Sequence, residues 1–333
     1  MFYNVHDIIK IESPEKIYEL DYFKTDEKLD NIDLVLGYDT SNAIYKDLLC
    51  SLSIEMGKNS YLGASELLYW SRHVLYVNLV EPLLRMMLIP KGYVLLHLAC
   101  MEKDGKGIMI SAPPDTGKTS CILNCLKSNY DHNRGLSLLS DDMVIAGFGA
   151  CNGSNGNGSL LSFPKPFTIS SHTLGSVFDI KTNLWYKIRS RVHSKGGRSA
   201  YKGIGSIDWI PIMSINALAQ IVFEPPKLYP TELMKINIGK EAVPAKLYFL
   251  SNEFTGEKDI SREEAVKLIL SNTDNAYITP PYNKIFPKLK LNGYSYQDLI
   301  DKEVEMVSNI IKNTDPIIVG RKDYSWYKYV LEN

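Results

Sequence analysis

Residues 111–120, with the sequence SAPPDTGKTS, combine the groups that bind the phosphates of a nucleotide. In a tight turn the backbone N–H groups can surround phosphate oxygens, Lys118 can neutralise the β- and γ-phosphates, and the Thr119 hydroxyl can bind Mg²⁺. The segment follows an apolar run suited to a central strand, 107–110, and precedes an apolar run with helical spacing, 121–126. This placement predicts a phosphate-binding loop between a strand and a helix.

The loop departs from the usual G-x-x-x-x-G-K-[ST] pattern at one position, because Ala112 stands where the first glycine is expected. Alanine is small enough to be tolerated there. The alternative is an ordinary strand-to-helix turn that contains Gly-Lys-Thr. The expected ligands are ATP or GTP, as phosphoryl donor, and Mg²⁺, and the expected nucleotide contacts are Ala112, Pro113, Pro114, Asp115, Thr116, Gly117, Lys118, Thr119 and Ser120.

Two adjacent acids, Asp141 and Asp142, follow another apolar run, 136–139, which places them at the carboxyl end of a predicted strand. In phosphoryl transfer one carboxylate can hold Mg²⁺ while a neighbour accepts the proton of the attacking hydroxyl. Consecutive strand residues point to opposite faces, so both acids reach one site only if the chain leaves the strand here. The alternative is a solvated acidic turn.

His97 interrupts an apolar strand candidate, 93–100, and a lone histidine in such a run is usually a core residue. Together with the loop and the acid pair, however, it resembles the HPr kinase/phosphorylase and PEP carboxykinase superfamily of P-loop proteins. Similar members show a strand histidine, a short hairpin, the phosphate loop, its helix, and a strand that ends in Asp-Asp. Here the hairpin would turn at 103–106, and His97 precedes Lys118 by 21 positions, a separation that the family also uses. The resemblance covers about residues 74–173.

The resemblance implies an α/β fold, with a PEP carboxykinase-like nucleotide-binding core on a mixed sheet. We expect a small mixed part at 1–63 and a catalytic domain at 64–333. The implied activity is transfer of the γ-phosphoryl group to a hydroxyl of a peptide or protein serine, of free serine or of a sugar. It places His97 in the site and favours Asp141 as base, which leaves Asp142 and Thr119 for Mg²⁺.

Two departures from the family narrow this expectation. No Glu-x-x-Gly-x-Gly-Ile signature follows the acid pair, so HPr is not the expected acceptor. The metal-ligand lysine and histidine arrangement of a PEP carboxykinase is not evident either. A nucleotide-binding regulatory module with little or no transfer activity stays open as an alternative, and a carboxykinase-type enzyme is the weaker one.

A basic segment, 187–202, carries seven Lys, Arg or His residues and a Gly196-Gly197 hinge. We expect a mobile loop that closes over the nucleotide and the acceptor, with Arg191 and Arg198 as catalytic groups that stabilise the transferring phosphoryl. A solvated surface and a nucleic-acid-binding arm are the alternatives.

Composition favours a cytoplasmic enzyme. The 333 residues are 45% hydrophobic and 23% charged with a net charge of −1, which offers no electrostatic footprint for nucleic acid. The start of the chain lacks the pattern of a signal peptide. The longest apolar stretch, 67–90, contains charged residues, so it predicts packed helices and no membrane span. A homo-oligomer stays open.

Five cysteines without framework spacing indicate reduced thiols. Cys121 and Cys125 have the spacing of a chelating pair, but core packing is the favoured interpretation.

Further along the chain, apolar runs predict a strand hairpin from 143–148 to 160–163 and a buried strand at 216–223. We also expect helices at 261–271 and 294–313 and a late strand at 316–320.

Overall fold

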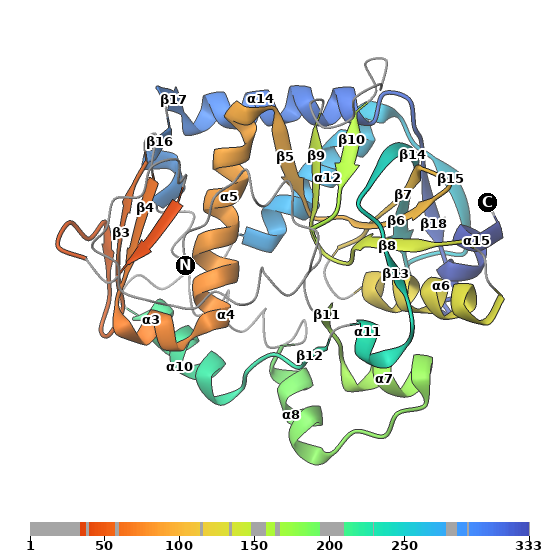
Figure 1. Ribbon diagram of the computed structural model, residues 1–333, viewed down its shortest axis with the longest axis horizontal. Helices are drawn as coiled ribbons and strands as arrows, with labels where there is room; N and C mark the ends of the chain where they lie inside the picture. The colour runs from red at the N-terminus through yellow and green to blue at the C-terminus, as the bar shows by residue number, and fades with distance from the viewer. Residues whose placement is uncertain are drawn as a thin grey trace.

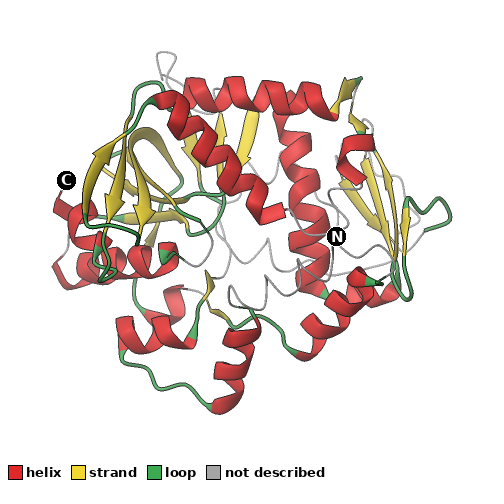
Figure 2. Cartoon of the chain, turned by 180° about the vertical axis from the view of Figure 1, so that it is seen from behind, coloured by secondary structure: helices red, strands yellow, loops and turns green. Residues whose placement is uncertain are grey.

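The computed structural model has a mixed α/β fold, with a small sheet and a large sheet that lie on either side of a helical segment (Figure 1). The view from behind shows the same separation of the two sheets (Figure 2). The structure describes residues 34–37, 40–56, 60–113, 116–132, 135–147, 158–163, 167–193, 210–228, 230–277, 285–291 and 293–332.

The small sheet comes from the N-terminal part of the chain, with strand order β1-β4-β3-β2. β1 pairs with β4 in parallel, and the other neighbours are antiparallel. The strands are β1 (Leu34–Gly37), β2 (Tyr45–Lys46), β3 (Ser51–Glu55) and β4 (Ser60–Ala64).

A helix from much later in the chain, α10 (Ile212–Val222), packs beside this part. The Asp47 carboxylate accepts the backbone N–H groups of Met213 and Ser214 at 3.0 Å each and thereby caps the start of α10. The predicted buried strand at 216–223 is therefore wrong. A short apolar run cannot distinguish a strand from a helix by pattern alone, and here part of the run, including Leu218, is exposed.

The apolar stretch after the small sheet is helical, as predicted. Its elements are α3 (Glu66–Trp70), α4 (Arg72–Leu75), the π-helical turn η1 (Tyr76–Val80), α5 (Glu81–Leu88) and the 3-10 turn η2 (Ile89–Lys91). All of α5 is buried between the two sheets (Figure 1). Buried Arg85 forms a bidentate ion pair with buried Glu303, at 2.8 and 2.6 Å, and ties α5 to the C-terminal half. Within the described residues no helix has the length and apolarity needed to span a membrane.

The large sheet is mixed, with ten strands in the described part of the chain. Along its main path the order is β13-β8-β6-β7-β14-β10-β9-β5, and β18 pairs with β14 and β15. The strands are β5 (Tyr93–Leu96), β6 (Ala99–Lys103), β7 (Lys106–Ser111), β8 (Ser137–Ser140), β9 (Val144–Gly147), β10 (Ser159–Leu161), β13 (Asn237–Ile238), β14 (Glu241–Ser251), β15 (Gly256–Asp259) and β18 (Asp315–Gly320).

Several predicted strands are confirmed. β6 and β7 form the expected hairpin, which turns through Asp104 and Gly105 in left-handed conformations (φ 51° and 76°). β9 and β10 form the second hairpin, and β18 is the late strand. The strand candidate at 93–100 instead divides into β5 and β6, because a tight turn, in which the Leu98 N–H binds the Leu96 carbonyl at 2.8 Å, breaks it at His97.

Helices cover both faces of the large sheet. Successive side chains along a strand point to opposite faces, so they pack into two separate hydrophobic cores. Ile108 and Ile110 of β7 pack in one cluster with Ile122 of α6 (Lys118–His132). Met109 points the other way and packs with Ile269 of α12 (Arg262–Tyr277). The sheet is thus buried on both sides, which holds its strand ends in fixed positions.

The helices predicted at 261–271 and 294–313 are confirmed. The first is α12, in which the Glu264 N–H binds Ser261 Oγ at 3.1 Å, and the second is α14 (Tyr296–Ile310). The remaining elements are β11 (Phe167–Thr168), α7 (Ser171–Phe178), α8 (Leu184–Val192), β12 (Lys227–Leu228), α11 (Pro230–Leu233), η3 (Phe286–Lys288), β16 (Lys290–Leu291), β17 (Tyr294–Ser295) and α15 (Trp326–Glu332).

Candidate active site

The topology brings the phosphate loop, the acid pair and His97 to one edge of the large sheet. β6 runs antiparallel to both β7 and β8, so the carboxyl ends of β7 and β8 meet at the edge where β6 begins. The phosphate loop follows β7, the acids follow β8, and His97 directly precedes β6. Three segments that are distant in sequence therefore converge because of strand direction.

The phosphate loop is described at Ala112, Pro113 and 116–120, while Pro114 and Asp115 lie outside the described residues. The Thr116 N–H binds the Pro113 carbonyl at 3.2 Å, which closes a turn. Helix α6 begins at Lys118 and contains the predicted helical run 121–126.

Gly117 is required by its surroundings. Its φ is +123°, and a Cβ there would lie 2.7 Å from Cζ3 of Trp326. Only glycine fits this combination of backbone conformation and close packing. The loop therefore rests directly on the buried indole of Trp326.

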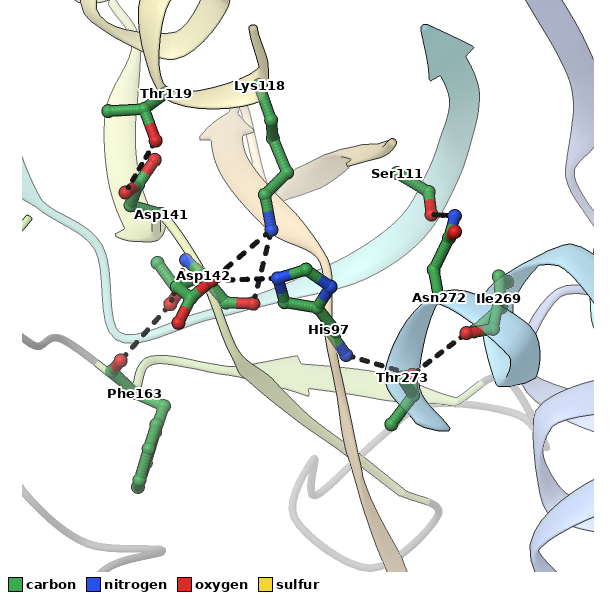
Figure 3. Close-up of polar contacts among 11 residues, drawn as sticks. His97, Ser111, Lys118, Thr119, Asp141, Asp142, Phe163, Ile269, Asn272 and Thr273 are labelled. Carbon is green, nitrogen blue, oxygen red and sulfur yellow. Dashed lines mark hydrogen bonds and ion pairs between the residues drawn. The ribbon is translucent and has the colours of Figure 1, made fainter. Parts of the chain in front are cut away.

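Lys118, Asp142 and His97 form a polar cluster (Figure 3). His97 Nε2 lies 2.9 Å from Asp142 Oδ1, and Lys118 Nζ lies 3.6 Å from the same oxygen. Lys118 Nζ also donates to the Asp142 main-chain carbonyl at 3.4 Å. His97 and Lys118 are buried, whereas the Asp142 side chain is 40% exposed, so this carboxylate can meet a molecule that arrives from solvent.

Asp141 points elsewhere, toward the first turn of α6 (Figure 3). The Thr119 hydroxyl donates to Asp141 Oδ2 at 3.2 Å, and Asp141 is buried. Neighbouring ligands of an octahedral Mg²⁺ bound at about 2.1 Å lie about 3 Å apart. The Thr119 hydroxyl and the Asp141 carboxylate therefore fit two adjacent ligand positions of Mg²⁺, with phosphate and water oxygens to complete the shell.

The divergence of the two acids follows from the end of β8. The Ser140 hydroxyl donates to the Phe163 carbonyl at 3.1 Å and accepts the Asp142 N–H at 3.4 Å. The chain thus turns out of the strand directly before the acid pair. As a result, both side chains reach the sheet edge but face different partners.

Ser120 and Ala112 belong to the loop's supporting structure. The Ser120 hydroxyl lies 3.1 Å from Thr173 Oγ1, and Thr173 is held by Ser170, which caps α7. Ala112 is buried at the end of β7, where its small side chain fits. Thr173 was not predicted from the sequence.

The basic segment differs from the prediction. Residues 187–192 belong to helix α8, so they are not part of a loop, and residues 194–202, with Arg198, lie outside the described residues. Arg189 donates to the carbonyls of Glu224 and Pro225, which fixes the helix. The Arg191 side chain is exposed on this helix.

Two further residues of the site region come from α12 and were missed. The Thr273 hydroxyl accepts the His97 N–H at 3.1 Å and donates to the Ile269 carbonyl at 2.9 Å (Figure 3). Its neighbour Asn272 donates to the Ser111 hydroxyl, at the end of β7, at 2.9 Å. Adjacent polar residues inside an apolar helical pattern were the available signal. α12 thereby connects the histidine to the strand that carries the phosphate loop.

We expect Thr273→Val to lower the free energy of unfolding by about 1–3 kcal/mol, because the buried His97 N–H loses its acceptor. Valine has nearly the same shape, so packing changes little. Urea denaturation measures the effect, and Thr273→Ser, which keeps the hydroxyl, is the control. Equal stabilities of Thr273→Val and the wild type would show that this hydrogen bond does not fix His97.

The cysteine pair on α6 is part of the core, as favoured from the sequence. Cys121 and Cys125 are buried against the sheet. A hydrogen bond with Cys125, together with burial, raises the pKa of the Cys121 thiol. Both effects disfavour the thiolate that metal binding requires.

The comparisons with known proteins add no relative: no family model matches the chain, and no curated protein matches it. Its function is therefore inferred from the geometry of this site. Five described residues carry that inference, namely His97, Lys118, Thr119, Asp141 and Asp142.

Proposed function

We propose that this chain is a Mg²⁺-dependent kinase that transfers the γ-phosphoryl group of ATP or GTP to a hydroxyl acceptor. The observation that carries the proposal is the convergence of the first turn of α6 with both acids and His97 at one sheet edge. We also propose that the chain is related to P-loop kinases of the HPr kinase and PEP carboxykinase type. This part of the proposal is based on the sequence motifs that resemble theirs.

The nucleotide phosphates would bind at the start of α6. Backbone N–H groups of the loop and the Lys118 ammonium provide the positive potential that a triphosphate requires. Thr119 and Asp141 would hold Mg²⁺, which when bound neutralises charge on the β- and γ-phosphates. The distance between Thr119 and Asp141 thus supports the reverse of the sequence-based assignment, which gave the metal to Asp142.

Asp142 would act as the general base. Its exposed carboxylate accepts the proton of the acceptor hydroxyl as the hydroxyl oxygen bonds to the γ-phosphorus. At the same time the bond from that phosphorus to the β–γ bridging oxygen breaks, and the nucleoside diphosphate leaves. His97 Nε2, 2.9 Å away, orients the carboxylate, and the Lys118 ammonium lies 3.6 Å from the same oxygen.

The presence of a second acid, Asp142, in contact with His97 favours transfer over the regulatory alternative. A regulatory module that only binds nucleotide requires one metal-holding carboxylate, and Asp141 suffices for that. In a kinase the second acid has a function, and it is the more exposed of the two.

The four cysteines in the described part of the chain form no disulfides, which supports a reducing compartment such as the cytoplasm.

The experiment that tests the proposal is a transfer assay with γ-labelled ATP and GTP in the presence of Mg²⁺. The acceptors are serine-containing peptides, free serine and sugars. We expect label on one acceptor class with the wild-type chain. A wild-type chain that binds nucleotide but labels no acceptor would support the regulatory alternative, and one that does not bind nucleotide would contradict both.

A further inference from the structure

The loop between β18 and α15, residues 321–325, lies at the same sheet edge as the candidate active site. β18 is parallel to β14, and β14 is parallel to β7. Their carboxyl ends therefore point in one direction, and this loop follows β18 as the phosphate loop follows β7. Ligands of α/β proteins bind at such edges, outside the carboxyl ends of the strands.

Tyr324, in this loop, lies beside the phosphate loop. Its Cδ1 atom is 3.6 Å from the position that a Cβ on Gly117 would occupy. The residue is nevertheless 52% exposed. A partly exposed aromatic side chain thus lies directly next to the glycine that precedes Lys118.

The ring of Tyr324 is held in place by Trp326. It packs edge to face on Trp326, with ring centroids 5.2 Å apart at 83°. Trp326 is fully buried, and its indole N–H donates to the Ser251 carbonyl at 2.9 Å, at the end of β14. The support of the exposed ring is therefore rigid.

The backbone at Tyr324 is also unusual. Its φ is +62°, a left-handed conformation that is unfavourable for a bulky residue. The turn that contains Tyr324 is fixed by Asp323, whose carboxylate accepts hydrogen bonds from both the N–H and the hydroxyl of Ser325. Strained residues of this kind occur preferentially at ligand-binding positions, where they hold a side chain in a functional orientation.

We propose that Tyr324 is the stacking platform for the base of the nucleotide. This inference rests on the proposed function, since it takes the phosphates of the same nucleotide to bind at the start of α6. A flat ring fixed beside the phosphate loop suits the face of a purine. Because stacking uses the face of the base and not its edges, Tyr324 would accept adenine and guanine alike.

The test is a pair of binding measurements by calorimetry on the full chain, with Mg·ATP and with inorganic Mg·tripolyphosphate, which has no base. Tyr324→Asn removes the ring, and asparagine tolerates the left-handed backbone, so folding is preserved. We expect this variant to bind Mg·ATP about tenfold more weakly and tripolyphosphate with wild-type affinity. Tyr324→Phe should bind both ligands like the wild type.

Tyr130→Asn is the matched control, since Tyr130 is a similarly exposed tyrosine near the far end of α6. Unchanged Mg·ATP affinity in Tyr324→Asn would overturn the stacking role while leaving the phosphate site intact. An equal loss for both ligands would also overturn the stacking role, because it would show that the substitution acts on the phosphate site and not on the base. A wild-type chain that binds neither ligand would overturn the nucleotide function itself, and the stacking role with it.

Discussion

Lys118→Ala is expected to lower the turnover of phosphoryl transfer by about 100-fold or more. The ammonium group is buried at the start of α6, where it lies 3.6 Å from Asp142 Oδ1. In the proposed mechanism, this low-dielectric position would let it compensate the charge of the phosphates and, as transfer proceeds, the charge that moves to the leaving oxygen. The measurement is kcat with γ-labelled nucleotide and the acceptor identified by the transfer assay.

Lys127→Ala provides the control for this variant. Lys127 lies nine residues further along the same helix, where it donates to the Val177 carbonyl at 2.7 Å. Its loss should leave turnover near the wild-type value. Nucleotide affinity and turnover of Lys118→Ala that equal those of the wild type would refute the phosphate-binding role of the loop.

Local patterns in the sequence predicted the parts of the site that are contiguous in the chain. The strand, turn and helix around Lys118 follow from a buried apolar run, a glycine and a helical repeat, and the structure has them at those positions. The strand that ends before Asp141 could be predicted from its apolar run in the same way. These elements are predictable because each depends on residues within a few positions of one another.

The sequence could not indicate which partner each acid takes. That choice depends on the Ser140 hydroxyl, which binds the Phe163 carbonyl and turns the chain out of β8. It also depends on α12, because Thr273 holds the main chain at His97 from 176 positions away. Contacts over such separations leave no periodic signal in a single sequence.

Two elements, β14 and α10, could not be predicted correctly from the sequence for other reasons. β14 contains Pro244 in its interior, which argues against a central strand, and the register shifts at this position, between Pro244 and Lys246. α10 was mistaken for a strand because its apolar residues continue onto an exposed face. In both cases tertiary packing overrides the local pattern.

The two acids should fail in different ways when each is changed to asparagine. Asp142→Asn removes the proposed base while keeping its size, so transfer should fall by about 10²–10⁴-fold with nearly unchanged nucleotide affinity. Asp141→Asn removes the charge next to the Thr119 hydroxyl, so it should instead raise the Mg²⁺ concentration needed for half-maximal activity. Titration of activity with Mg²⁺ in both variants separates these effects.

His97→Gln is a useful companion, because it changes the partner of Asp142 and leaves the contact between Thr119 and Asp141 untouched. It should lower transfer without changing the Mg²⁺ requirement. If Asp142→Asn raises the Mg²⁺ requirement while Asp141→Asn leaves it unchanged, the acids have the roles implied by the family resemblance, with Asp141 as base. If both variants lose only nucleotide affinity, neither acid acts as a base, and the site binds nucleotide without transferring its phosphate.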